Sequence, residues 1–190
     1  GGGRVTGKVG SFDVGVVNIQ TDRLRSVGAK STNFSVVRLK KDIFARSSIG
    51  ALFENRSRST TGQGSNQAWG VDGSFGLSDD LSVLAYYAKT ETDGLDGLDA
   101  SYRGQISYNA DLWGGSVDHL VVGDDFSPEM GFVRRKDFRQ TNASGRFSPR
   151  IGSISWIRQV TFLSNFNHLE NEQAGYLESR LWGGMASVEL

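Results

Sequence analysis

The chain has 190 residues, of which 37% are hydrophobic and 11% aromatic, and its 21 Lys and Arg balance its 21 Asp and Glu. This balance argues against a protein that coats nucleic acid, because such a protein carries a basic excess. No apolar run reaches the roughly 18–20 residues of a membrane helix, and the absence of cysteine excludes disulfide frameworks and thiolate metal sites. The length suits one domain, residues 1–190, and is short for two.

Apolar residues recur with a period of two along most of the chain, and no stretch has the period of an amphipathic helix. Trp69, Val71 and Phe75, for example, alternate with Asp72 and Ser74. Each such segment has one apolar face and one small or polar face, as a half-buried strand does. The pattern predicts an all-β chain of about eleven strands. They run near residues 4–10, 12–22, 33–40, 47–57, 66–77, 81–92, 101–109, 112–122, 137–148, 152–166 and 174–189.

The predicted connections alternate in length. The short ones fall at Ser11, Lys41–Asp42, Ser78–Asp80, Ala110–Asp111 and Pro149–Arg150, and the longer ones near 23–32, 58–65, 93–100, 123–136 and 167–173. In an antiparallel up-and-down meander, all the short turns would therefore gather at one end. Outer-membrane β-barrels have this asymmetry, whereas a soluble sandwich has no reason for it. Because the last residues still read as strand, we predict part of a transmembrane outer-membrane β-barrel that continues beyond residue 190.

Aromatic residues of matching parity mark both ends of three predicted strands. The pairs are Trp69 with Phe75, Tyr102 with Tyr108, and Trp156 with Phe166. Six to ten tilted residues span about 16–26 Å along a barrel axis, close to the roughly 25 Å apolar band between aromatic girdles. We therefore expect these residues to face lipid, the alternative being the core of a soluble β-protein. The opposite faces favour the barrel, because they carry residues that suit a water-filled lumen: Asp72, Ser74, Arg103, Gln105 and Ser107.

Three segments resemble a known family. They are Thr32–Arg38 (TNFSVVR), Ser47–Ser57 (SSIGALFENRS) and His119–Arg139 (HLVVGDDFSPEMGFVRRKDFR). They are similar to a bacterial family of unknown function, whose members look like outer-membrane β-barrels fused behind an N-terminal carbohydrate-binding module of family-nine type. The resemblance covers essentially the whole chain, but the carbohydrate-binding module is absent from it. It implies a part-barrel whose remaining strands follow Leu190, and it carries no catalytic residues.

The loop at 123–138 has an acidic front half and a basic back half. Asp124, Asp125 and Glu129 are weak candidates for calcium ligands, although their spacing matches no EF-hand. Alternatively, Asp124 and Asp125 pair with Arg134 and Arg135 or accept hydrogen bonds from backbone amides, and carbohydrate binding is a third reading. We predict an ordered loop that leans over or into the barrel mouth, with Asp124 or Asp125 bonded to an arginine.

These patterns predict an integral protein of the bacterial outer membrane that acts as a channel, transporter or scaffold, without a cofactor and without catalysis. The alternative is a cell-surface binding or assembly subunit that contacts polysaccharide or a partner protein. A third class, a hydrolase built in the barrel wall, lacks a visible constellation: Asp118 and His119 point to opposite faces of a strand, and His168 falls in a predicted loop. The expected partners are outer-membrane lipid and lipopolysaccharide, with other subunits or polysaccharide as further candidates and nucleic acid excluded.

Overall fold

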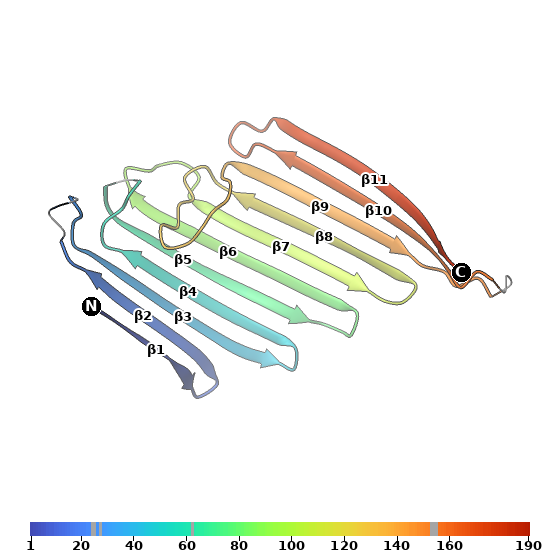
Figure 1. Cartoon of the computed structure of the whole chain (residues 1–190), viewed down its shortest axis with the longest axis horizontal. Coiled ribbons are helices and arrows are strands. Elements are labelled where there is room, and N and C mark those ends of the chain that lie inside the picture. The colour runs from blue at the N-terminus through green and yellow to red at the C-terminus, as the bar shows by residue number, and fades with distance from the viewer. Residues whose placement is uncertain (24–25, 27, 62, 153–155) are drawn as a thin grey trace.

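The computed structural model describes residues 1–23, 26, 28–61, 63–152 and 156–190. They form one antiparallel sheet of eleven strands in sequence order (Figure 1). The strands are β1 (Gly2–Val9), β2 (Phe12–Thr21), β3 (Thr32–Phe44), β4 (Ser47–Arg56), β5 (Gln63–Gly76), β6 (Leu81–Asp93), β7 (Ala100–Asn109), β8 (Trp113–Val122), β9 (Phe138–Phe147), β10 (Gln159–Glu170) and β11 (Leu177–Glu189). Within the described residues, no helix is long and apolar enough to cross a membrane.

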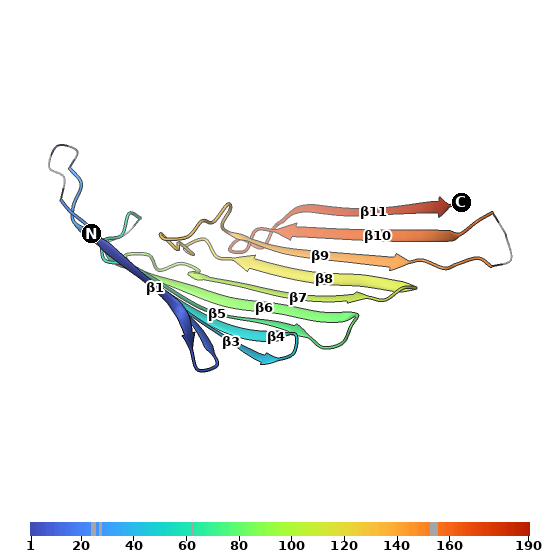
Figure 2. The ribbon, with the colours of Figure 1, turned by 60° about the horizontal axis from the view of Figure 1, so that its bottom comes forward.

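Each strand pairs with its neighbours in sequence, which confirms the predicted all-β antiparallel up-and-down meander. The sheet is curved but not closed, and β1 and β11 lie far apart as its two edges (Figure 2). Because ten antiparallel pairings separate them, β1 and β11 run in the same direction.

Four of the five predicted short connections are short in the structure, and all of them lie at one end of the sheet. They are residues 10–11, 45–46, 77–80 and 110–112. The connection between β3 and β4 lies at residues 45–46 and not at the predicted Lys41–Asp42, because β3 continues to Phe44. The opposite end carries residues 22–31, 57–62, 94–99, 123–137 and 171–176. We call these two ends the short-connection end and the long-connection end.

The connection between β9 and β10 is the exception, because it spans residues 148–158 instead of turning at Pro149–Arg150. A tight turn there would pair Phe147 with Gly152, but Phe147 pairs with Phe162. The Phe147 ring stacks between Trp113 and Phe162, with centroid separations of 4.2 and 6.2 Å. This row of three rings stabilises the pairing of Phe147 with Phe162, which lies ten residues beyond the partner that a tight turn would give.

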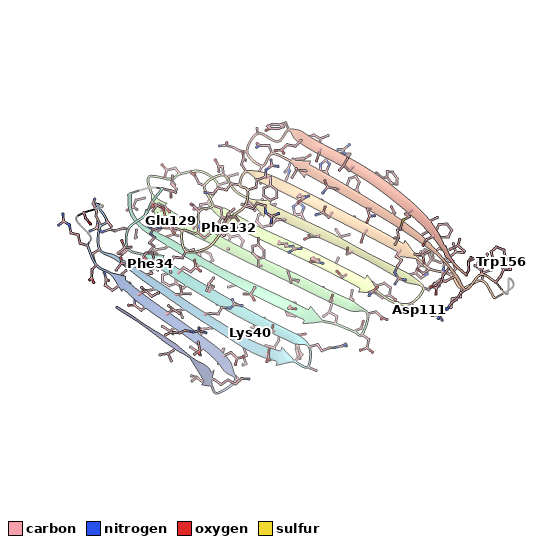
Figure 3. All side chains as sticks on the ribbon, in the orientation of Figure 1. Phe34, Lys40, Asp111, Glu129, Phe132 and Trp156 are labelled. Carbon is pink, nitrogen blue, oxygen red and sulfur yellow. The ribbon has the colours of Figure 1, made fainter. Side chains whose placement is uncertain are left out.

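The predicted tenth strand, 152–166, is therefore corrected to Gln159–Glu170, and residues 153–155 lie outside the described part of the chain. Trp156 lies in the connection and not on a strand, at the short-connection end (Figure 3). The register differs by an even number of residues, so Phe166 keeps its predicted face of the sheet.

Directly paired residues lie on the same face of a sheet, so the register defines two faces. The apolar face is defined by two rows that together cross all eleven strands: Val5, Val16, Val37, Phe53 and Trp69, and then Phe75, Val83, Ile106, Val117, Ala143, Phe166 and Trp182. The polar face is typified by the row Asp42, Ser48, Ser74, Leu84, Gln105, Asp118, Asn142 and Asn167. The apolar face is exposed along much of its length, with Ile106 and Val117 each 48% exposed.

Candidate functional site

The polar face carries ion pairs that bridge strands. Arg38 on β3 reaches across β4 to Asp72 on β5, with a bidentate contact that includes Nη2–Oδ2 at 2.9 Å. Gly50 on β4 makes this crossing feasible, because a Cβ at that position would lie 2.7 Å from the guanidinium carbon. Gly50 therefore leaves the space in which the Arg38 side chain crosses β4.

A second cluster lies on β7 and β8. Arg103 donates to both carboxylate oxygens of Asp118, at 2.7 and 2.9 Å, and to the amide oxygen of Gln105 at 3.2 Å. Gln105 in turn donates to the Ser107 hydroxyl at 3.2 Å. The register places Asp72, Ser74, Arg103, Gln105 and Ser107 on the polar face, where the last three form one chain of hydrogen bonds.

The residues predicted to form a lipid-facing girdle share the opposite face, with one exception. The register places Trp69, Phe75, Tyr102, Tyr108 and Phe166 on the apolar face. Trp156 lies in the 148–158 connection, where its side chain is 64% exposed.

The 123–137 loop is ordered and packs onto the polar face near the long-connection end. Phe126 of the loop is buried against Val122 and Phe138, and Val133 packs against the same cluster. Figure 3 places Glu129 and Phe132 of this loop over the sheet, at the same end as Phe34. The loop thus folds over the sheet, and its place over or in a barrel mouth stays a prediction.

Glu129 anchors the loop to the neighbouring 57–62 connection. Its side chain is 3% exposed, and it forms an ion pair with Arg56 of β4 at 3.2 Å. It accepts hydrogen bonds from the Ser59 hydroxyl at 2.6 Å and from the Thr60 and Thr61 amides at 2.7 and 3.0 Å. Arg56 is also held by the Phe34 ring, 5.4 Å from its guanidinium carbon. The carboxylate thus joins two long connections above the sheet.

Burial on its own would raise the pKa of Glu129, but hydrogen bonds from Ser59, Thr60 and Thr61 outweigh it and lower this pKa from 4.5 to about 2. A group whose pKa is lower in the folded state stabilises that state above its unfolded pKa. We therefore expect the anchor to weaken as the pH falls from about 4.5 towards 2. The protection factors of the Thr60 and Thr61 amides against hydrogen exchange should fall over this range in the wild type, and this fall should be absent in Glu129→Gln. Equal pH dependence in both proteins would contradict this prediction.

Asp124 and Asp125 bind backbone amides, so the prediction that one of them bonds an arginine is wrong. Asp124 accepts from the Leu98 amide and Asp125 from the Gly97 amide, each at 2.7 Å. A side chain at Gly97 would collide with both carboxylates, because its Cβ would lie 2.6 Å from Asp125 and 2.9 Å from Asp124. The two aspartates therefore bind the 94–99 connection, whereas Arg135 pairs with Glu178 and the arginine partner of Glu129 is Arg56.

Asp124, Asp125 and Glu129 do not converge on one point. Glu129 binds the 57–62 connection, whereas the two aspartates bind the 94–99 connection. Within the described part of the chain, no group of three or more His, Asp or Glu side chains is placed to hold a metal ion.

Substituting Gly123 by alanine is expected to destabilise the loop by about 1–3 kcal/mol. The Gly123 amide donates to Ala100 at 2.9 Å, and a Cβ there would collide with the Leu98 carbonyl oxygen. Gly131→Ala is the matched control, because its Cβ would meet only Pro128, at an ordinary 3.6 Å. Urea unfolding monitored by tryptic cleavage of the loop measures the stability of both variants, Gly123→Ala and Gly131→Ala. Equal stability of the two variants would refute the close packing of the loop.

The basic half of the loop points towards the other edge of the sheet. Arg135 forms an ion pair with Glu178 of β11, and its guanidinium carbon lies 5.4 Å from the Phe138 ring centroid. Arg134 is exposed. Asp137 ends the loop at a φ of 58° and accepts hydrogen bonds from Asn171 and Gln173 of the 171–176 connection. The loop thus contacts three of the other four long connections.

The two histidines lie on neighbouring sides of Thr141, because the register pairs both His119 on β8 and His168 on β10 with this residue of β9. His119 Nδ1 lies 2.8 Å from the Thr141 hydroxyl on the neighbouring strand. His168 lies on β10, not in the predicted loop, and it bridges Glu170 at 2.7 Å and Arg180 at 3.1 Å.

Comparisons with protein-family models, curated proteins and solved structures give no match.

Proposed function

We propose that this chain forms part of the wall of a bacterial outer-membrane β-barrel, with its apolar face towards lipid and its polar face towards a water-filled lumen. The observation that carries the proposal is the two apolar rows that together cross all eleven strands, opposite a polar row with hydrogen bonds between strands. A soluble single-layer sheet would leave this large apolar area in water at a cost of roughly 25 cal/mol per Å².

The proposed role is passage of polar solutes, limited by the 123–137 loop. The Arg38–Asp72 and Arg103–Asp118 pairs line the wall below that loop. Because the loop is bound to neighbouring connections through Glu129 and through Asp124 and Asp125, it would narrow the mouth on the polar side. Lumen residues of both charges suit polar solutes of either sign.

Closure requires strands beyond these eleven. β1 and β11 run in the same direction, so joining them directly would create one parallel pair. Single-chain bacterial barrels have an even number of antiparallel strands. An odd number of further strands, from the same chain or from a partner, would satisfy both edges and remove the aggregation hazard that unpaired edges carry.

Reconstitution of the full reading frame that contains these strands tests the proposal. We expect insertion into lipid vesicles and discrete conductance steps in planar bilayers, with larger steps for Glu129→Ala. Failure to insert would refute the membrane assignment. Insertion without conductance in either protein would refute passage and favour the assembly role, in which the free edges contact another subunit.

A further inference from the structure

The apolar face contains a groove of about 650 Å³ across β3, β4, β5 and β6. This volume lies within the roughly 300–1,000 Å³ range of small-molecule sites. Small residues make it hollow, since Gly73 pairs directly with Ala85 and lies diagonally across from Ala51, whose direct partner is Val71. A Cβ at Gly73 would lie 2.6 Å from the Phe75 ring, so the glycine lets that ring lie close to the sheet.

The walls of the groove are apolar and aromatic. They include Phe12, Leu39, Ile49, Val71, Phe75 and Tyr87. The register places all six on the apolar face, the face that the proposed function turns towards lipid. A flexible hydrocarbon chain is the ligand that such an elongated apolar surface accommodates.

One end of the groove carries a positive charge. Lys41 lines it, and its ammonium lies 5.1 Å from the centroid of the Phe12 ring. Among the described residues Lys41 has no carboxylate partner, whereas the neighbouring Lys40 lies 3.8 Å from Asp42 and Lys8 lies 3.5 Å from Asp13. An ammonium without a carboxylate partner attracts an anion when it lies at the level of lipid headgroups.

The charge lies towards the short-connection end, near which Figure 3 labels Lys40, the neighbour of Lys41. Short turns of outer-membrane barrels lie on the periplasmic side. A phosphate at this level belongs to an inner-leaflet glycerophospholipid, whereas lipopolysaccharide phosphates would lie at the opposite end of the strands.

We propose that the groove on β3–β6 binds one anionic glycerophospholipid, with an acyl chain along Ala51 and Ala85 and against the Phe75 ring that covers Gly73, and with the phosphate beside Lys41. This site rests on the proposed membrane function and extends it to a defined lipid. The bound lipid would seal the hollow that the small residues leave in the apolar face.

Native mass spectrometry of the full-length protein in detergent, with added phosphatidylglycerol, phosphatidylcholine or lipid A, tests the site. We expect one phosphatidylglycerol to be retained in preference to the other two. Ala85→Phe should fill the groove and weaken this binding about tenfold, a change of roughly 1.4 kcal/mol. Ala186→Phe is the matched control, because Ala186 lies on the apolar face of β11, away from the groove, and should leave retention unchanged.

Lys41→Gln tests the charge without filling the groove. It should abolish the preference for phosphatidylglycerol over phosphatidylcholine, and Lys8→Gln should not. Equal retention of phosphatidylglycerol by the wild type and Ala85→Phe, or preferred retention of lipid A, would overturn the site. If the protein inserts into vesicles and yet shows either result, the lipid site alone fails; if it does not insert, the proposed function fails.

Discussion

Replacing Ile106 by arginine is expected to destabilise the membrane-inserted barrel by about 2–4 kcal/mol, with the full effect at the bilayer midplane. Ile106 lies on the apolar face between Val83 and Val117, and its side chain is 48% exposed in the isolated sheet. In a bilayer that exposed surface would meet hydrocarbon, where a guanidinium loses its hydration. The free energy of unfolding from lipid vesicles in guanidinium chloride measures the effect.

Ser107→Arg is the matched control for this substitution. Ser107 is the next residue of β7 and lies on the polar face beside Ser82 and Ser116. An arginine there would project into water, so we expect a change below about 0.5 kcal/mol. Equal losses for the two variants would mean that neither face meets lipid, and a larger loss for Ser107→Arg would reverse the two faces.

Substituting Glu129 by alanine is expected to release the 123–137 loop, with a local loss of about 3–5 kcal/mol. The substitution leaves the Arg56 guanidinium and the amides of Thr60 and Thr61 without their common acceptor. The Arg56 side chain is 21% exposed, and a largely buried charge that loses its partner costs more than the hydrogen bond it formed. The release should raise the rate of tryptic cleavage after Arg134 and Arg135 by about a hundredfold or more.

Asp96→Ala controls for the loss of a carboxylate from a long connection. Asp96 is exposed in the 94–99 connection, so its removal should leave the cleavage rate unchanged. Cleavage of Glu129→Ala at the wild-type rate would show that the buried cluster around Phe126 holds the loop without the carboxylate.

The strands follow from the sequence because their periodicity is local. β4 and β6, for example, begin at the predicted residues Ser47 and Leu81 and end within one residue of the prediction. β10 could not be predicted in the same way, since alternation continues back through Trp156 and Pro149–Arg150 has the composition of a turn. Its register depends on the row of Trp113, Phe147 and Phe162, which only the paired strands bring together.

The site was less predictable than the strands, because its contacts join segments that lie far apart in sequence. The charge pattern of 123–138 indicates an ordered loop, but Ser59, Thr60 and Thr61, which donate hydrogen bonds to Glu129, lie 68 to 70 residues away in sequence. Neither Arg56 nor Asn66, which accepts from the Glu129 amide at 3.1 Å, has a local signal that links it to this loop. Gly97 was the available hint, because a glycine between exposed polar residues can admit a close approach by another segment.

Spin-label scanning of β7 tests most directly whether one face of the sheet meets lipid. The chain has no cysteine, so each variant from Tyr102→Cys to Tyr108→Cys carries a single attachment site within it. In lipid vesicles we expect collision rates with oxygen to peak at 102, 104, 106 and 108, and those with a water-soluble nickel complex to peak at 103, 105 and 107. Uniform access of the nickel complex to all seven positions would contradict a membrane barrel.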